Sequence, residues 1–182
     1  MTKPHFFGYG SLVNAATHSY PDALPATVKG WRRMWRHTTF HDSAFLTVTP
    51  DPTCSIEGLL AQVPGDDWAA LDERETGYFR SPVPQSDLTH GADFAMSVQI
   101  YQTRTDKDDS TDHPILLSYL DVVVQGYLQV FGEDGAKRFF ETTSGWNAPI
   151  LNDRSAPKYP RAQRLSADET RFVDACLAAH VQ

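Results

Sequence analysis

The sequence predicts an α+β fold, in which a sheet formed largely by the first hundred residues is accompanied by helices that come mostly after it. Short runs of β-branched and aromatic residues, bounded by Gly or Pro, recur as far as Tyr101 and have the composition of strands. From Pro114 onward, apolar residues recur at helical spacing. With 182 residues, no internal repeat and no linker-like stretch, the chain is expected to form one domain over residues 1–182.

The first predicted strand is short and leads directly into a glycine loop. The apolar pair Phe6-Phe7 is followed at once by Gly8-Tyr9-Gly10-Ser11-Leu12. Because glycine ends regular pairing and permits sharp turns, a strand followed by a tight turn is expected near the N-terminus.

Five further runs have strand composition and bring the predicted sheet to about six strands. These runs are Val28–Arg36, Phe45–Thr49, Ile56–Val63, Tyr78–Val83 and Phe94–Tyr101. A short helix with an Asp cap is expected after Pro64-Gly65-Asp66, ending near Gly77. The polar stretch Gln85–Gly91 is expected to be a connection.

Three helices are predicted in the second half of the chain. They cover Pro114–Phe131, Glu133–Thr143 and Ala167–Ala179. Ser166 and Glu169 have the spacing of a capping box at the start of the last helix. Between the second and third of these helices, the Ser144–Arg164 segment has Trp, Tyr and Pro residues typical of an ordered loop.

Charge and composition exclude several classes of function. The net charge of −7 argues against nucleic acid as a partner, because phosphate binding requires a concentrated positive field. A basic cluster of Lys29, Arg32, Arg33 and Arg36 is interpreted as the solvated face of a strand. Without an apolar span or an N-terminal leader, the protein is expected to be soluble and cytoplasmic, with no membrane partner.

No residue pattern indicates a metal or another cofactor. His37 and His41 are four residues apart but have no evident third ligand, and the acidic stretch Thr103–Asp112 lacks the glycine and glutamate of a calcium loop. Cys54 and Cys176 are interpreted as packing residues, because neither has a neighbour that would make its thiol reactive. The oligomeric state is not indicated.

The glycine loop is the first candidate for chemistry. Its backbone N–H groups can converge on an anion or an oxyanion, although a purely structural turn explains the same residues. Neither the complete dinucleotide pattern nor a phosphate-binding Gly-Lys-Ser ending is present, and Ser11 is not in the Gly-x-Ser-x-Gly context of a hydrolase nucleophile.

The second candidate is Glu75, in the run Leu71-Asp72-Glu73-Arg74-Glu75-Thr76-Gly77-Tyr78. Charged residues at a helix end usually form a solvated face with local ion pairs. Glu75, however, directly precedes Thr-Gly-Tyr, where the chain leaves the helix for a strand, so its side chain can point into a cleft beside the sheet.

Four short motifs in order resemble the γ-glutamylcyclotransferases, and most closely their ChaC-like branch. They are Phe7–Leu12, Val28–Arg33, Ile56–Leu60 and Leu71–Tyr78, and the resemblance extends over roughly residues 4–135. It implies a small mixed β-barrel flanked by helices, with residues 136–182 as a C-terminal helical extension. The chain departs from the pattern by having one glycine, Gly77, before its tyrosine and by the added Ser144–Arg164 segment.

The resemblance also implies an activity. By it, Glu75 is the general acid/base, and Tyr9, Gly10, Ser11 and Leu12 form the loop that holds the γ-glutamyl group of a small-molecule substrate. The substrate would cyclise to 5-oxoproline and release its amine without a cofactor or metal, and glutathione is one candidate. The alternative is a non-catalytic binding or scaffold protein with the same barrel.

The Ser144–Arg164 segment has two interpretations. Arginines such as Arg154 and Arg161 could contact substrate carboxylates from a lid, since guanidinium groups suit that task. Alternatively, the segment is a clamp that ties the last helix to the barrel, and the sequence favours the clamp.

Overall fold

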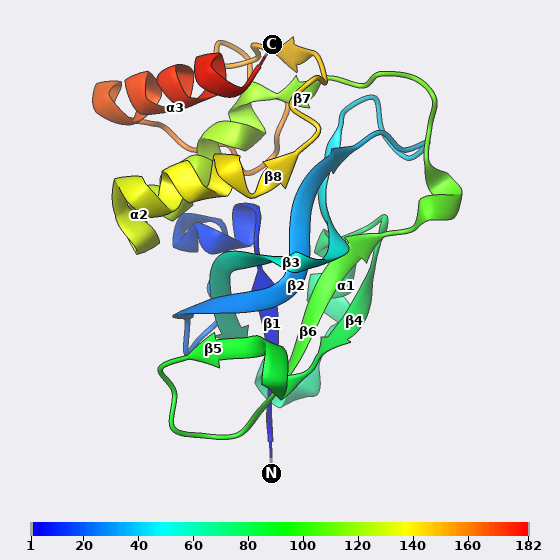
Figure 1. Ribbon diagram of the computed structural model, residues 1–182, viewed down its shortest axis with the longest axis vertical. Coiled ribbons are helices and arrows are strands. Elements are labelled where there is room, and N and C mark those ends of the chain that lie inside the picture. Colours follow the sequence, from blue (N-terminus) through cyan, green and yellow to red (C-terminus); the bar gives the residue numbers. More distant parts are fainter. Residues whose placement is uncertain (1, 182) are drawn as a thin grey trace.

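The computed structural model describes residues 2–181 and shows the predicted α+β architecture (Figure 1). Seven strands form one sheet in the order β4-β6-β1-β3-β2-β5, with β8 paired to β2. Their bounds are β1 Lys3–Gly8, β2 Leu24–Arg36, β3 Phe45–Gln62, β4 Tyr78–Val83, β5 Leu88–His90, β6 Met96–Thr103 and β8 Thr143–Ser144. The helices are α1 Ala69–Arg74, α2 Leu117–Glu141 and α3 Ala167–His180.

The sheet is mixed and curls into a half-barrel. Strand β1 is central, parallel to β6 and antiparallel to β3. The predicted mixed sheet flanked by helices is therefore confirmed, but the barrel is open, since the pairing among the described residues ends at β4 on one side and β5 on the other. Helices α2 and α3 lie together near the C-terminus, at the end of the molecule opposite the N-terminus (Figure 1).

The two strands predicted over Phe45–Thr49 and Ile56–Val63 are halves of one strand, β3, that runs from Phe45 to Gln62. Pro50 and Pro52, which suggested a break, lie at an irregularity within it. Lys29 of β2 pairs with Ser55, whereas Trp31 pairs with Pro50, so the register shifts around Gly30, whose φ is 85°. Prolines lack an N–H donor and are tolerated at such a bulge, which also bends the strand pair.

Other boundaries differ from the predictions by a few residues. The stretch Gln85–Gly91, predicted to be a connection, contains the three-residue strand β5, which pairs with Ala26–Val28 of β2. Helix α2 begins only at Leu117, because Ile115–Leu116 is a strand, β7, that pairs with β9, Ile150–Leu151. Gly132 interrupts α2 with a φ of 69°, near the predicted junction of two helices.

The apolar core has two parts. The larger cluster fills the space between the sheet and helices α2 and α3, and it includes Phe7, Ile56 and Tyr127. A smaller cluster, with Phe6 and Leu71, packs α1 against the other side of β1. Strand β1 therefore contributes to both clusters, and its C-terminal end at Gly8 is held firmly between them.

The interpretation of the basic cluster as a solvated face is wrong for Arg33, which is 1% exposed. Its guanidinium lies 5.0 Å from the ring of Tyr127 and donates to the carbonyl oxygen of Tyr9, the hydroxyl of Tyr127 and the carbonyl of Glu57. The shift in strand register around Gly30 changes which side chains of β2 face inward. The alternating pattern of the sequence alone does not reveal this shift. Arg33 therefore supports the loop after β1 from the buried side of the sheet.

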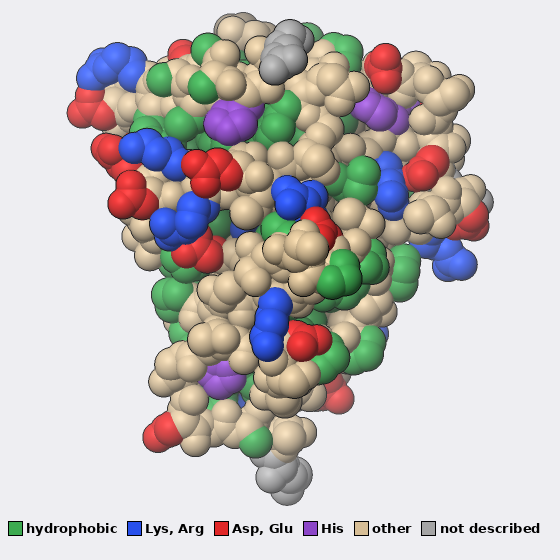
Figure 2. Space-filling model, viewed as in Figure 1, with side chains coloured by type: hydrophobic (Ala, Val, Ile, Leu, Met, Phe, Trp, Pro, Cys, Tyr) green, Lys and Arg blue, Asp and Glu red, His purple; other side chains and the backbone are tan. Residues whose placement is uncertain are grey.

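Charged side chains are intermixed on the surface. On the face in Figure 2, acidic and basic side chains lie beside one another over the helical end rather than in a patch of one sign. Among the described residues, no helix is long and apolar enough to cross a membrane.

Candidate active site

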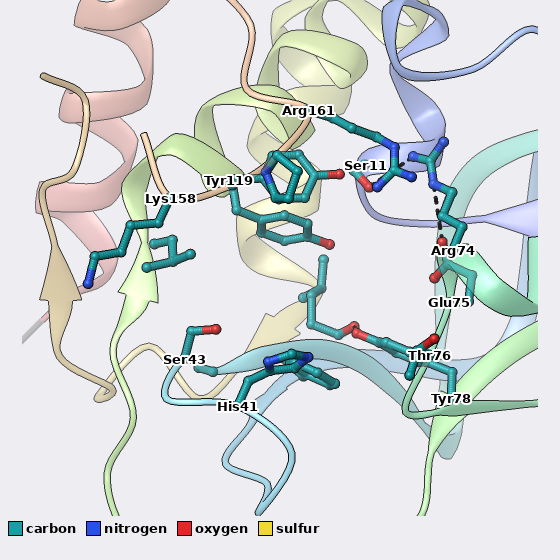
Figure 3. Close-up of a pocket in the computed structure, with 16 residues that line it drawn as sticks. Ser11, His41, Ser43, Arg74, Glu75, Thr76, Tyr78, Tyr119, Lys158 and Arg161 are labelled. Carbon is teal, nitrogen blue, oxygen red and sulfur yellow. Dashed lines mark hydrogen bonds and ion pairs between the residues drawn. The ribbon is translucent and has the colours of Figure 1, made fainter. Parts of the chain in front are cut away.

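A cavity of ≈ 360 Å³ opens between the sheet and the C-terminal part of the chain (Figure 3). One side, here called the sheet-side wall, is formed by Ser11, His41, Ser43, Ala44, Phe45, Leu46, Arg74, Glu75, Thr76 and Tyr78. The other side comprises Leu116 and Tyr119 near the start of α2 and a stretch, here called the C-terminal wall, of Lys158, Tyr159, Pro160 and Arg161. Residues far apart in the sequence thus meet around one space.

The predicted site residues come together at the inner end of this cavity. A smaller adjoining cavity is lined by Tyr9, Gly10, Ser11, Leu12 and Glu75. Ser11 and Glu75 line both cavities, whereas Tyr9, Gly10 and Leu12 line only the smaller one. The glycine loop and the carboxyl group are therefore within reach of one small molecule.

The side chains of the loop differ in their surroundings. The Tyr9 hydroxyl donates to the carbonyl oxygen of Tyr101 at 2.7 Å, so it already has a structural partner. Leu12 packs in the smaller core cluster. Ser11 begins a short 3-10 helix over Ser11–Val13, where the first N–H groups have no partner within the helix. Of the four predicted residues, Ser11 is the one whose side chain is exposed to the main cavity.

Gly10 is required by close packing. A Cβ at this position would lie 2.7 Å from the hydroxyl oxygen of Tyr119 and 3.3 Å from a methyl carbon of Leu46. Both distances are shorter than ordinary van der Waals contact, so a side chain would displace Tyr119 or the loop. The absence of a side chain lets Tyr119 cover the loop closely.

Glu75 occupies the end of α1, where its N–H still donates to the carbonyl oxygen of Leu71 at 2.9 Å. The backbone then leaves the helix, and the side chain turns into the cavity, where it is 17% exposed. Burial raises the pKa of this carboxyl above its ordinary value, and the positive charges of Arg74 and Arg161 oppose the rise. A carboxyl with a raised pKa in a cavity is suited to proton transfer.

Arg74 links Glu75 to the glycine loop. Its Nε lies 3.4 Å from a Glu75 carboxylate oxygen, and its guanidinium donates to the carbonyl oxygen and hydroxyl of Thr17. A longer contact of 3.4 Å reaches the hydroxyl of Ser11. In the sequence, the position of Arg74 directly before Glu75 is the signal that points to this role. Glu73, by contrast, is exposed and lines neither cavity.

Two tyrosines, Tyr78 and Tyr119, also line the main cavity. Tyr119 was placed on the apolar face of a helix, and Tyr78 at the start of a strand, where aromatic residues usually serve packing. Tyr78 donates to the carbonyl oxygen of Leu46 at 2.8 Å and stacks on Phe45 with ring centroids 5.4 Å apart. Burial raises the pKa of both phenols, so they remain protonated at neutral pH.

The Ser144–Arg164 segment serves as a clamp in its first part. The Asp153 carboxylate accepts hydrogen bonds from the backbone N–H and hydroxyl of Ser118, at the first turn of α2. Arg154 pairs with Asp121 of α2 and Asp174 of α3, at 2.7 Å in each case. These contacts act as a clamp, but they tie α3 to helix α2, whereas the sequence suggested a direct tie to the barrel.

The second part of the segment lines the cavity. The backbone N–H of Lys158 donates to Asp153 at 2.8 Å, and the ring of Tyr159 packs edge-on against Tyr119 at 5.0 Å. The C-terminal wall is thus fixed to the clamp and faces Glu75 across the cavity. One part of the segment therefore makes clamp-like contacts, and another part lines the cavity, while the lid interpretation stays a prediction.

No group of three or more potential metal ligands occurs among the described residues. His37 accepts a hydrogen bond from the backbone of His113, while His41 lines the outer part of the cavity. The two histidines therefore make different contacts: His37 binds the backbone of His113, and His41 lines the cavity.

By fold, the chain is similar to several solved structures, two of which are named as γ-glutamyl cyclotransferases. One named Gamma-glutamyl cyclotransferase has a TM-score of 0.58 at 13% identity and covers 94% of this chain and 98% of its own. A yeast γ-glutamyl cyclotransferase specific to glutathione has a TM-score of 0.50 at 13% identity and covers 99% and 97%. YkqA from Bacillus subtilis has a TM-score of 0.59 at 18% identity and covers 80% of this chain and 57% of its own.

A sequence comparison identifies the family to which the chain belongs. A family model described as ChaC-like protein matches residues 5–115, more than half of the chain. The chain belongs to the ChaC-like family. A comparison with curated proteins gives no match. The C-terminal wall lies outside the residues matched by the family model.

Proposed function

We propose that this protein is a γ-glutamylcyclotransferase, which converts a small γ-glutamyl compound to 5-oxoproline and releases its amine. Membership of the ChaC-like family and similarity to cyclotransferase folds support the class of reaction. The observation that carries the proposal is the position of Glu75, a largely buried carboxyl that lines the same small cavity as the glycine loop.

The proposed mechanism needs one proton carrier. The α-amine of the substrate attacks its own γ-carbonyl carbon, forming the ring C–N bond, while Glu75 removes the proton that the nitrogen must lose. When the bond between the γ-carbon and the leaving nitrogen breaks, Glu75 returns a proton to that nitrogen. The electron pair of the broken bond departs with the amine, so neither a cofactor nor a metal is consumed.

The glycine loop would hold the curled substrate. Gly10 permits close approach of the backbone, and the N–H groups at the start of the 3-10 helix after it can stabilise the negative charge that develops on the γ-carbonyl oxygen. Such a donor contributes about 3 kcal/mol to catalysis in comparable sites. We assign this task to the backbone of Gly10, Ser11 and Leu12, because the Tyr9 hydroxyl is already engaged with Tyr101.

Glutathione is the first substrate to test, because one structure of similar fold is described as specific to glutathione. The cavity extends beyond Glu75 toward His41, Ser43 and Lys158, which leaves room for a peptide as leaving group. A panel of γ-glutamyl peptides and amines, assayed for 5-oxoproline, would identify the leaving group.

The decisive variant is Glu75→Gln, which keeps the size of the side chain but removes its basic group. We expect kcat to fall by about 10²–10⁴, the usual contribution of a general base, while the thermal midpoint changes little. Glu73→Gln is the matched control, because Glu73 is exposed and lines neither cavity, and it should retain nearly full activity.

The alternative is a non-catalytic protein that only holds a small molecule in the same cavity. It predicts substrate binding without release of 5-oxoproline by the wild-type protein. Equal turnover by wild type and Glu75→Gln would instead show that the reaction proceeds without Glu75 as its base.

A further inference from the structure

The C-terminal wall contains an arginine without an acidic partner. Within the described part of the chain, no carboxylate lies within ion-pair distance of Arg161, and its guanidinium donates no hydrogen bond to protein. The residue is nevertheless only partly exposed and lines the cavity. A guanidinium group has five N–H donors, and withdrawing them partly from water without partners is unfavourable unless a ligand supplies acceptors.

The side chain is directed at the inner end of the cavity. Figure 3 shows Arg161 extending toward Ser11 and Arg74, which lie on the opposite wall. The charges of Arg74 and Arg161 both act on the Glu75 carboxyl. Two guanidinium groups and one carboxylate leave this end of the cavity with a net charge of about +1, which suits a ligand that carries a carboxylate.

The backbone that presents Arg161 is firmly held. Pro160 precedes it, and Ala162 donates to the carbonyl oxygen of Tyr159 at 3.1 Å, which closes a turn around residues 159–162. The backbone N–H of Tyr159 donates a hydrogen bond to the hydroxyl of Ser118 at 3.3 Å. The backbone that carries the Arg161 side chain is therefore fixed before a ligand arrives, and less backbone entropy is lost on binding.

We propose that Arg161, together with the Ser11 hydroxyl, binds the α-carboxylate of the γ-glutamyl group. This inference rests on the proposed function, since it names how that substrate is recognised. The α-carboxylate and α-amine are attached to the same carbon, so an anion site on one side of Glu75 brings the amine to the base. Arg161 is then a substrate-binding residue that selects γ-glutamyl compounds with a free α-carboxylate.

The test compares two substrates that differ only at this group: a γ-glutamyl dipeptide with a free α-carboxylate and the same compound as its α-carboxamide. Both can cyclise. We expect the wild-type protein to prefer the carboxylate in kcat/KM by about 10–100-fold, the range for a hydrogen bond to a charged group. Arg161→Met should lose most of this preference through a higher KM for the carboxylate, with little change for the carboxamide.

Two further variants separate charge recognition from folding. Arg161→Lys keeps the positive charge and should recover part of the preference, although it lacks the planar fork. Arg164→Met is the matched control, because Arg164 is exposed and lines neither cavity, and it should behave as wild type. If Arg161→Met slowed both substrates equally, or if wild type showed no preference, the carboxylate site would be ruled out.

A binding measurement tests the carboxylate site independently of the proposed catalytic activity. Calorimetric titration with 5-oxoproline and with its carboxamide requires no turnover. Tighter binding of 5-oxoproline by wild type than by Arg161→Met, with equal binding of the carboxamide, would support the site even in a protein that cyclises neither substrate. No turnover by wild type would overturn the proposed function, whereas equal binding of the two compounds by wild type would overturn the inference.

Discussion

The two walls of the cavity differ in how their polar side chains are held. On the sheet-side wall, Arg74 contacts Thr17 and Glu75, and the Tyr78 hydroxyl donates to a backbone carbonyl. On the C-terminal wall, Lys158 and Arg161 have no ion-pair partner among residues 2–181. Side chains whose donors are satisfied within the protein hold the cavity wall in place, whereas unpaired cations are available to bind a ligand. The comparison supports our assignment of proton transfer to the first wall and of an arginine that recognises the substrate carboxylate to the second.

After Glu75→Gln, the largest effect on activity is expected from Gly10→Ala. The added methyl group would lie 2.7 Å from the Tyr119 hydroxyl, so the loop or the tyrosine must move. Misplacement of a substrate by about 1 Å can cost about 100-fold in rate, and we expect kcat/KM to fall by this order. Gly91→Ala is the control, because a Cβ there meets no atom within 4 Å. A fully active Gly10→Ala variant would contradict the proposed role of the loop.

A smaller effect, on stability rather than rate, is expected where the segment acts as a clamp. Arg154→Met removes both ion pairs and leaves Asp121, whose side chain is 8% exposed, without its partner. We expect a loss of about 1–2 kcal/mol in the free energy of unfolding, or roughly 2–8 °C in the thermal midpoint, with kcat and KM nearly unchanged.

The matched control for this variant is Arg171→Met. Arg171 pairs with Asp168 on the surface of α3, where both side chains are more than 70% exposed (72% and 87%), so its loss should not change the midpoint. If Arg154→Met changed KM strongly at unchanged stability, the division of the segment into a clamp and a cavity wall would be incorrect.

The smallest expected effect is a displacement of the pH profile. Glu75 must be deprotonated to accept a proton, so kcat/KM should rise with pH as this carboxyl ionises, above the ordinary range for glutamate because burial raises its pKa. The charge of Arg161 favours the ionised form. Arg161→Met should therefore raise the pKa of Glu75 further and move the acid limb to higher pH, while Arg161→Lys should leave it near its original position. Measuring kcat/KM from acid to neutral pH checks the direction.

Much of the fold could be predicted from local patterns. Strand β4 agrees with its predicted bounds, and the capping box of Ser166 and Glu169 begins α3 as expected. The predictions failed where pairing between distant segments decided the structure. The three-residue strand β5 exists because β2 offers it an edge, and Arg33 faces inward because of the irregularity near Gly30.

The site was predicted in part for a similar reason. Glu75 and the glycine loop are short local motifs, and they were recognisable together. Tyr119 had no such signal, because a tyrosine on an apolar helix face usually serves packing. Arg161 was named only together with Arg154, as an arginine that could reach a substrate carboxylate, and the sequence favoured a clamp for that segment. Only the three-dimensional arrangement places them opposite Glu75.

The hydrogen bonds of the Asp153 carboxylate affect how the protein could diversify in evolution. It accepts hydrogen bonds from Ser118 at the start of α2 and from the backbone of Lys158, so one side chain attaches the C-terminal wall to the rest of the protein. Residues between this attachment and α3 could be exchanged among related enzymes without rebuilding the sheet that carries Glu75. A change in how the α-carboxylate of the substrate is recognised would then require changes in a short exchangeable segment, whereas the proton-transfer machinery would be inherited intact.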